Sequence, residues 1–569
     1  MAAATATLPN AEIEPNERQR EAAEEALHQA SDAAWRPKAN IWAIALTVTL
    51  ATFMEVLDTS IANVALPHIG GSLGASQDEA TWVLTSYLVA NAVILPASAY
   101  LTTFIGRKKF YMICVVMFGV SSMMCGLAPS LPILIFCRIL QGAGGGGLAP
   151  SEQAILADTF TPKQRGQAFA LYGLAVVCAP AIGPSLGGWI TDNYNWRWIF
   201  FINVPIALLS LFLTNRLVED PPHIKREVKQ AKKYGLKLDL FGFGLLATGF
   251  GSLEFLLDKG QEDDWFSSHV IVFFTFLCIM SLVTLVFWEL YELKVGNRPI
   301  LNLTLFKRKT FTIPVILMFV LGFSLYGTTV LIPQFVQTLL GYTAELAGFV
   351  ISPGGICIML MMPIVGFLIG RTDPRWLICF GFFILATSMA LMHTLSLESS
   401  FKYIMWVRIY QASGLAFLFI PINTISYTGV KRSENNDVAG LTNLARNIGG
   451  SVGTAFVATM LSRGSQRHEA YMIRNLTPGS PGFDTQVRRL MPLFHGGGGS
   501  AGPGFGGGAG MSGGIHAAEG FIYAQMHRQA AMLAYMDIVS ALGVFCVCMI
   551  PLVLMIGKIK PAADGPAIH

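Results

Sequence analysis

The chain has 569 residues and a formal net charge of +4 at neutral pH; 53% of its residues are hydrophobic and 13% are charged. Soluble domains carry about 25% charged residues. The composition therefore excludes a soluble globular protein and predicts a membrane protein. The net charge by itself says little about partners. The orientation of the helices, derived below, explains where the basic residues lie, so no nucleic-acid partner is expected.

Residues 1–38 are rich in Ala, Glu and Gln and lack the apolar core of a signal peptide, so they are predicted to form a cytoplasmic N-terminal tail. After this tail the sequence contains fourteen apolar stretches, each close to the ~20 residues that cross a bilayer as one helix. They are 41–66, 80–101, 110–128, 131–156, 168–190, 198–217, 238–257, 269–290, 311–337, 343–370, 376–394, 402–427, 438–461 and 530–556. The predicted fold class is an all-α polytopic membrane protein.

Basic residues predict the orientation of these helices. They cluster in every second loop, for example at 107–109, 219–237 and 307–309, and are scarce in the short loops on the other side. Because short cytoplasmic loops carry the excess of Lys and Arg, both termini are predicted to be cytoplasmic. The nine cysteines all lie in apolar stretches, which argues against disulfides and against a metal site.

An internal repeat divides the chain into halves. The motif Arg-x-x-Gln-Gly-x-Gly at 138–144 recurs 270 residues later, at 408–414, as Arg-x-x-Gln-Ala-x-Gly. The same offset relates Gly183 to Gly453. Repeated halves around a site at the middle of the bilayer are typical of secondary transporters that work by alternating access.

The predicted domains follow from this repeat. They are an N-terminal six-helix bundle at 39–218, a basic cytoplasmic linker at 219–237, two inserted transmembrane helices at 238–290, a cytoplasmic loop at 291–309, a C-terminal six-helix bundle at 310–556 and a cytoplasmic tail at 557–569. The second bundle includes a long periplasmic loop at 463–529, whose centre is a Gly-rich tract that cannot pack a core.

A few charged residues lie deep inside the apolar stretches. A charge at the bilayer centre costs roughly 2.5–3.5 kcal/mol on insertion scales, so each is expected to face the protein interior and find a partner. The basic ones are Arg138, Arg408 and Arg446. In the first stretch, Glu55 and Asp58 are three residues apart and so share one face of the helix.

These groups suggest a proton-coupling site. A carboxyl group that loses its proton near an arginine and regains it in an apolar environment can carry protons across the membrane. We expect Asp58, assisted by Glu55, to exchange the proton and Arg138 to be its switchable partner. The alternative is a fixed salt bridge between Asp58 and Arg138. By position, Glu152 and Glu289 are expected to be solvated or paired with loop arginines, and Glu254 and Asp537 to be interfacial.

The glycine-rich runs lack the Gly-Lys-Ser/Thr ending of a nucleotide-binding loop, and no HExxH motif is present. An ion gradient, with no cofactor, is therefore the expected energy source. A polytopic membrane enzyme or receptor is a remote alternative.

Several motifs carry a resemblance to a known family. They are the run 57–67 (Leu-Asp-x-x-Ile-x-Asn-Val-Ala-Leu-Pro), Gly106-Arg107-Lys108, the 138–144 motif, the 179–188 run (Ala-Pro-x-x-Gly-Pro-x-x-Gly-Gly), and Trp196 to Pro205. The sequence resembles the major facilitator superfamily, in particular its fourteen-helix drug/proton antiporters of the EmrB/QacA type. The resemblance implies two six-helix bundles plus two inserted helices. It departs from the family at Thr103, where an Asp is usual.

The resemblance also implies roles for residues. The antiporter motif comprises Ala179, Pro180, Gly183, Pro184, Gly187 and Gly188. Conformational or structural roles fall to Gly106, Arg107, Gln141, Gly142, Gly144, Arg408 and Arg446. Apart from the resemblance, the aromatic residues Phe53, Tyr87 and Tyr326 are candidates to line a substrate cavity.

The implied function is proton-coupled export of hydrophobic or amphipathic drugs from the bacterial inner membrane. A natural amphiphile, such as a fatty acid or siderophore, is the alternative substrate. The resemblance further implies a periplasmic adaptor protein as a partner and, through it, an outer-membrane channel. The 463–529 loop is the expected docking segment.

Overall fold

The computed structural model describes residues 35–233, 239–295, 298–474, 476, 480–495 and 511–556. Throughout these ranges the chain forms helices and short connections, without a strand. Most of the predicted N-terminal tail, the Gly-rich tract at 496–510 and the predicted C-terminal tail lie outside the described residues.

The first half forms the expected series of long helices. They are α2 (Ile41–Leu73), α3 (Gln77–Ile105), α4 (Arg107–Leu127), α5 (Leu131–Gly145) continued by α6 (Leu148–Thr159), α7 (Arg165–Asn193), and α8 (Trp198–Phe201) continued by α9 (Asn203–Leu217). Gly106 is the single residue between α3 and α4, and its φ of 89° is a conformation that favours glycine. Ser76 and Glu79 form a capping box at the start of α3.

The middle of the chain forms α10 (Pro222–Lys233), α11 (Leu240–Lys259) and α12 (His269–Val295). Helix α11 begins where the Asp239 carboxylate accepts a hydrogen bond from the Gly242 N–H. This inserted helix packs against α12 and also against α3 of the first half and α17 of the second. The inserted pair is therefore part of the bundle rather than a separate unit.

The second half continues the helical pattern. Its helices are α13 (Lys309–Gln334), α14 (Ala344–Leu368), α15 (Pro374–Met392), α16 (Phe401–Ser426), α17 (Asn435–Ile473), α18 (Pro481–His495) and α19 (Met511–Leu554). Short helical segments are η1 (Trp265–Ser267), η2 (Leu303–Lys307), η3 (Phe335–Leu339) and η4 (Arg432–Glu434). Both flanks of the long loop are helical, because α17 extends to Ile473 and α19 begins at Met511.

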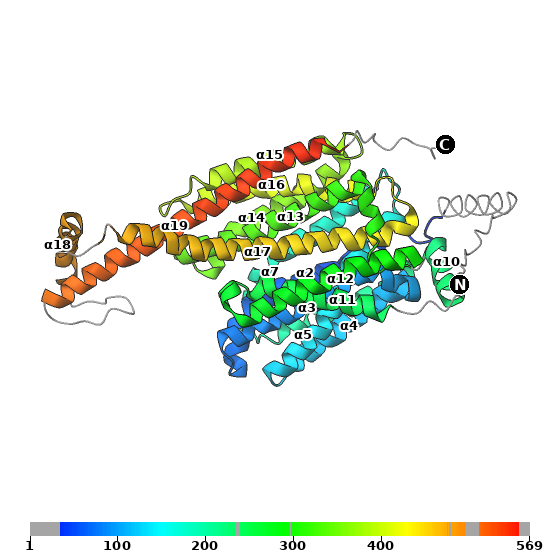
Figure 1. Ribbon diagram of the computed structural model, residues 1–569, viewed down its shortest axis with the longest axis horizontal. Helices are drawn as coiled ribbons and strands as arrows, with labels where there is room; N and C mark the ends of the chain where they lie inside the picture. Colours follow the sequence, from blue (N-terminus) through cyan, green and yellow to red (C-terminus); the bar gives the residue numbers. More distant parts are fainter. Residues whose placement is uncertain are drawn as a thin grey trace, which may run out of the picture.

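Within the described residues, twelve helices are long and apolar enough to cross a membrane, or thirteen if the bent α7 counts as one span. Helix α17 is not among them, although it runs the length of the bundle beside α13 and α19 (Figure 1). It carries buried polar side chains such as Asn443 and Arg446. The all-α polytopic fold is confirmed, and the count of fourteen spans stays a prediction that depends on α17.

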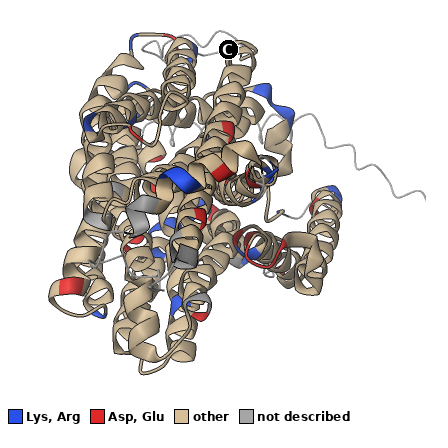
Figure 2. Cartoon of the chain, turned by 90° about the vertical axis from the view of Figure 1, so that its left-hand side faces the viewer, with Lys and Arg blue, Asp and Glu red and all other residues tan. Residues whose placement is uncertain are grey.

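The bundle has two distinguishable ends. We call the end with α10 and the start of α2 the linker end, and the end beyond which α18 and the first part of α19 project the loop end (Figure 1). Charged residues are sparse on the helices of the bundle when it is viewed from the loop end (Figure 2). Large apolar side chains such as Phe212, Phe276 and Phe287 are exposed on the outside, as lipid-facing residues are.

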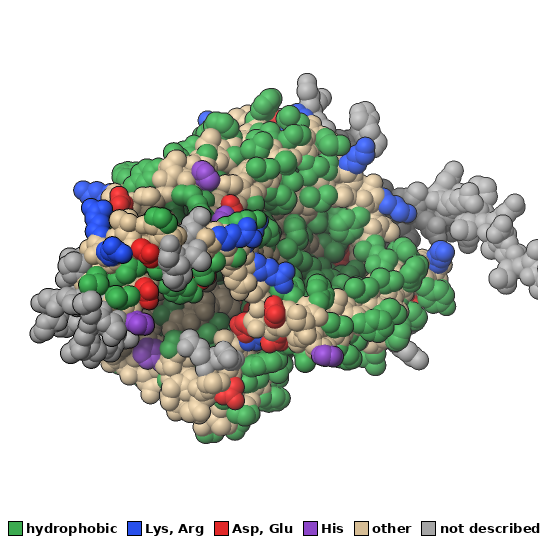
Figure 3. Space-filling view, turned by 60° about the vertical axis from the view of Figure 1, so that its left-hand side comes forward, with side chains coloured by type: hydrophobic (Ala, Val, Ile, Leu, Met, Phe, Trp, Pro, Cys, Tyr) green, Lys and Arg blue, Asp and Glu red, His purple; other side chains and the backbone are tan. Residues whose placement is uncertain are grey.

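The two halves are hydrogen-bonded to each other near the linker end. Asn435 Nδ2 donates to Asp158 Oδ1 at 2.6 Å, and Asn436 Nδ2 donates to Thr102 Oγ1 at 3.0 Å. Figure 3, which brings the loop end forward, shows a surface hollowed between the upper and lower parts of the molecule. The halves are thus held together at the linker end, while the opposite side is indented.

Candidate functional site

A buried ion pair joins three helices of the first half. Arg138 Nη1 of α5 lies 2.6 Å from Asp58 Oδ2 of α2, and both side chains are fully buried. Asp58 Oδ1 also accepts from Gln141 Nε2 at 2.9 Å and from Asn203 Nδ2 of α9 at 2.7 Å. Three donors on one carboxylate stabilise its charged form. The structure brings Asp58 and Arg138 together and encloses both.

The aromatic candidates lie in different environments. Tyr87 is buried, with its ring centroid 4.3 Å from the Arg138 guanidinium carbon, so it packs on the ion pair as a cation–π partner. Phe53 is half-buried beside the apolar cluster that includes Leu57. Tyr326 is half-buried on α13, and its ring occupies the space that a Cβ at Gly450 would need.

Glu55 is placed differently from Asp58. It lies one helical turn nearer the linker end and is partly exposed, whereas Asp58 is buried. Its Oε1 accepts a hydrogen bond from Asn91 Nδ2 at 3.0 Å, but its Oε2, which is itself buried, has no hydrogen-bond partner in the described part of the chain. A carboxyl oxygen without a donor can take up a proton without breaking an existing bond.

A second acid lies further toward the linker end. Glu152 of α6 is fully buried, and its Oε1 accepts from Thr49 Oγ1 at 2.6 Å while its Oε2 lacks a partner. Thr49 precedes Glu55 by six residues on α2, or about 9 Å of helix rise. The expectation that Glu152 is solvated or paired with a loop arginine is therefore wrong, because α6 turns this residue into the bundle.

For two other acidic residues, the environment predicted from sequence position is also wrong. Glu289 is fully buried and accepts from the Ile300 N–H at 3.0 Å, because the chain after α12 folds back over it. Glu254 is buried between α11 and α17 and accepts from Ser451 Oγ at 2.7 Å, so it is not interfacial. Asp537 is partly exposed and pairs with Arg467 and His468.

A polar chain crosses from the second half to the first. Arg446 Nη1 of α17 donates to the Tyr172 hydroxyl at 2.8 Å, and that hydroxyl donates to Asn443 Oδ1 at 3.0 Å. Asn443 Nδ2 then donates to Gln153 Oε1 of α6 at 2.9 Å. Arg446 is buried, so its charge lies at the interface between the halves.

The predicted antiporter motif lies where α7 packs on α2. A Cβ at Gly183 would lie 2.3 Å from Ser60 Oγ, and one at Gly187 would lie 2.9 Å from Ile61 Cγ2, so both positions require glycine for the close approach. Gly188 faces open space. Ala179 is buried, and α7 bends by 43° just after Pro180 and before Pro184.

Arg107 holds a second buried ion pair, near the linker end. Its Nη1 lies 2.6 Å from Asp158 Oδ2, and it also donates to the Ala154 carbonyl at 3.0 Å. Asp158 is the same residue that accepts from Asn435 of the second half. Arg107 thus has a buried acidic partner, Asp158, which sequence spacing alone did not identify.

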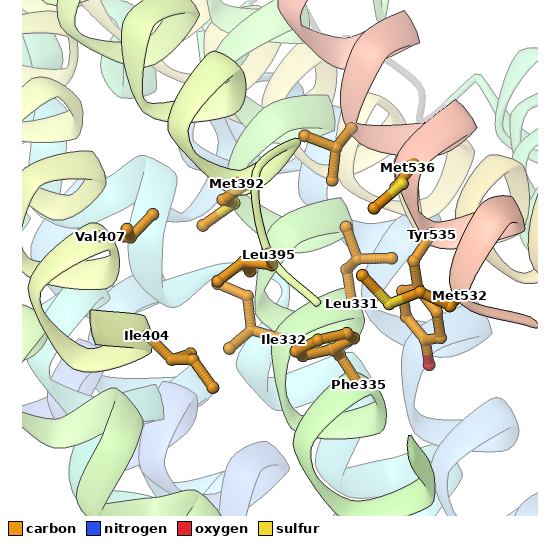
Figure 4. Close-up of a pocket in the computed structure, with 11 residues that line it drawn as sticks. Leu331, Ile332, Phe335, Met392, Leu395, Ile404, Val407, Met532, Tyr535 and Met536 are labelled. Atoms are coloured by element: carbon orange, nitrogen blue, oxygen red, sulfur yellow. The ribbon is translucent and has the colours of Figure 1, made fainter. Parts of the chain in front are cut away.

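The described part of the chain contains an apolar pocket in the second half, near the loop end (Figure 4). It lies between α13, α15, α16 and α19 and contains no acidic residue. Its lining comprises Leu331, Ile332, Phe335, Met392, Leu395, Ile404, Val407, Met532, Tyr535, Met536 and Val539. None of the three aromatic candidates belongs to it.

Comparisons with known proteins show which family this chain resembles. The family model described as Major Facilitator Superfamily matches residues 48–454. The multidrug export protein EmrB of Escherichia coli is 36% identical over 79% of this chain and 85% of its own length, and the probable multidrug resistance protein EmrY of the same organism is 36% identical over 80% and 87%. The fatty acid resistance protein FarB of Neisseria gonorrhoeae is 37% identical over 76% and 83%.

Solved structures agree on the fold. The proton:xylose symporter XylE matches with a TM-score of 0.55 at 15% identity, covering 92% of this chain and 97% of the symporter. The human organic anion transporter MFSD10 matches with a TM-score of 0.52 at 12% identity, covering 74% and 94%.

Proposed function

We propose that this chain, which belongs to the major facilitator superfamily and is a multi-pass membrane transporter rather than an enzyme, uses the proton gradient to export hydrophobic or amphipathic compounds. The relatives at 36% identity are named as multidrug export and resistance proteins, which supports drugs as substrates. The sequence has no nucleotide-binding motif, so an ion gradient is the energy source. The bacterial inner membrane, with both termini cytoplasmic, is the proposed location.

Alternating access is supported by the contacts between the halves. The Arg107–Asp158–Asn435 cluster joins them at the linker end, where the proposed cytoplasmic side lies. For substrate to enter from that side, this cluster must open and the indented side must close. Breaking hydrogen bonds to a buried carboxylate costs more than breaking bonds in water, so the cluster favours the closed linker end.

The contrast between two acids on one helix carries the proton-coupling proposal. Asp58 is enclosed and bonded to three donors, while Glu55 is partly exposed and has one oxygen without a partner. We therefore assign proton exchange chiefly to Glu55. The Asp58–Arg138 ion pair has a structural role, because it holds α2, α5 and α9 together. The buried Glu152, toward the linker end, is a candidate for the next proton acceptor.

The test is transport by the purified chain in proteoliposomes. An imposed proton gradient should drive uptake of a fluorescent amphipathic cation into liposomes with inverted orientation, and Glu55→Gln should reduce this uptake at least about 100-fold. Substrate exchange without a gradient should survive in Glu55→Gln, because it needs no proton transfer. Normal gradient-driven uptake by this variant would exclude Glu55 as the proton carrier, and Asp58→Asn would then be the variant to measure.

A natural amphiphile is the alternative substrate class. FarB, at 37% identity, is named for fatty acid resistance, which supports a long-chain carboxylate as a candidate. Uptake of radiolabelled fatty acid in the same liposomes, compared with a drug cation, tests this directly.

A tripartite assembly is the proposed setting of the pump. The ends of α17 and α19, together with α18, project beyond the bundle at the loop end (Figure 1). This projection has no evident task in transport itself and offers a helical surface to a periplasmic adaptor, which in turn reaches an outer-membrane channel.

A further inference from the structure

A buried carboxyl group lies where the inserted helix α11 meets α17 of the second half. Both oxygens of Glu254 lie within hydrogen-bonding distance of the Ser451 hydroxyl, at 2.7 Å for Oε1 and 3.0 Å for Oε2. The same hydroxyl lies 3.2 Å from the Asn447 carbonyl oxygen, one turn earlier on α17. Within the described residues, no Lys, Arg or His forms an ion pair with Glu254.

The hydrogen bonds of this cluster fit a protonated Glu254. An ionised carboxylate can only accept, so two charged oxygens would share the single hydrogen of a neutral hydroxyl. A buried charge with neither a cation nor enough donors is costly. A protonated carboxyl instead donates to the Ser451 oxygen, whose own hydrogen is then available to the Asn447 carbonyl. The acidic ligands that a metal ion would need are absent from the described residues around it.

The titratable groups on the helices packed around this carboxyl are few. They are Asp258 and Lys259 on α11, the buried Cys278 on α12 and Arg446 on α17. Asp258 accepts a hydrogen bond from Thr85 of α3, and Arg446 donates to Tyr172 of α7. Each of these two charged groups thus has a polar partner of its own, other than Glu254.

The contact between Glu254 and Ser451 joins parts that alternating access would separate. Near the loop end, α11 is hydrogen-bonded to Thr81 and Thr85 of α3, which belongs to the first half. Helix α11 also packs more extensively against α3 than against α17. A rocking motion of the halves would therefore part Glu254 from Ser451, together with the hydrogen bond that joins η1 to α17.

We propose that Glu254 is a second proton-binding site, which holds a proton while it contacts Ser451 and releases it once that contact opens. The proton comes from water at the loop end and leaves toward the linker end, where Asn447 and Asn443 follow at successive turns of α17. The inference rests on the proposed proton-coupled export and deepens it, because Glu254 would add a second coupled proton to the one on Glu55. It also gives the inserted helices a role in coupling.

The number of coupled protons can be measured with the full-length protein in the same liposomes. With the membrane potential clamped at zero by potassium and valinomycin, each coupled proton raises the steady-state accumulation of substrate about tenfold per pH unit of gradient. Wild type should therefore accumulate a fluorescent amphipathic cation about 100-fold per pH unit, and Glu254→Gln about tenfold. Glutamine keeps the shape of the protonated acid but has no proton to release.

The matched control is Glu398→Gln. It makes the same change at an exposed position between α15 and α16, so it should keep the accumulation of wild type.

Infrared difference spectroscopy of the purified protein in lipid nanodiscs detects the proton without transport. At neutral pH, the spectrum of wild type minus that of Glu254→Gln should contain the C=O stretching band of one protonated carboxyl. The corresponding difference for Glu398→Gln should lack this band, because an exposed glutamate is ionised at neutral pH.

Two results would overturn the proposal. Equal accumulation by wild type and Glu254→Gln means that Glu254 couples no proton, even if the infrared band reveals a fixed one. A difference spectrum without the band means that the buried carboxyl is ionised in this conformation. If thermal unfolding shows that Glu254→Gln does not fold, Glu254→Met decides by the same criteria. A wild type without gradient-driven uptake would refute the proposed function itself, and this inference with it.

Discussion

The first and second halves share a scaffold but not its charge. Arg138 is paired with Asp58 inside the first half, whereas Arg408 at the repeated position has Gln411 as its hydrogen-bond partner and lacks a carboxylate among the described residues. The acids Glu55, Asp58 and Glu152 all belong to the first half. The difference teaches that the arginine–glutamine motif is a structural unit of the repeat, and that within the described residues only the first half completes it with a carboxylate.

The largest expected contrast comes from removing each arginine. Arg138→Gln leaves Asp58 buried without a cation and should lower the free energy of unfolding by about 3–5 kcal/mol. Arg408→Gln removes a buried charge that has no counter-ion among the described residues, so it should leave the free energy of unfolding unchanged or raise it. Unfolding by sodium dodecyl sulfate in bicelles measures both. Equal losses would mean that the two arginines do the same structural work and that the halves do not differ as described.

A smaller contrast concerns the residue after each glutamine. A Cβ at Gly142 would lie 2.3 Å from the Tyr87 carbonyl oxygen, whereas the second half has a buried Ala412 at the matching position. Gly142→Ala should therefore destabilise the protein by about 1–3 kcal/mol through overpacking. Ala412→Gly should cost about 0.5–1 kcal/mol from helix propensity. The same bicelle titration compares the two variants, and a cheaper change at Gly142 would contradict the close approach of α3 and α5.

The smallest effect on transport is expected from deleting the long loop at 463–529, which has no counterpart in the first half. Deleting residues 463–529 with a short replacement linker should leave liposome transport within about twofold of wild type and should remove resistance in cells that contain the adaptor. Deleting 495–516 alone is the control for the Gly-rich centre. If neither deletion changes cellular resistance, the loop gives no support to a tripartite assembly.

Much of the architecture could be predicted from the sequence, because a membrane leaves few choices. The lengths of the apolar stretches predicted the long helices, and the motif repeated after 270 residues predicted the two related halves. The proximity of Asp58 and Arg138 followed from the cost of isolated charges in lipid. These inferences depend on composition and spacing, which the sequence states directly.

Other features depend on which side chains a helix directs into the bundle, and residue spacing alone does not predict that direction. Glu152 lies near a helix end, so it was expected to meet water, yet α6 directs it into the bundle beside Thr49. Asp158 could not be identified as the partner of Arg107, because the two are 51 residues apart and meet only through the packing of α4 and α6. The exposure that separates Glu55 from Asp58 likewise arises from neighbouring helices.

The polarity of α17 bears on how the protein enters the membrane. Because this helix is not apolar enough by itself, we expect the translocon to release it poorly into lipid until its neighbours are present. Its main neighbours are α13, made earlier, and α19, made last. Membrane integration of α17 should then be incomplete in a nascent chain truncated at residue 495 and complete in the full chain, which glycosylation mapping of its loop end would measure. Biogenesis of the second half would thus finish only when the final helix emerges from the ribosome.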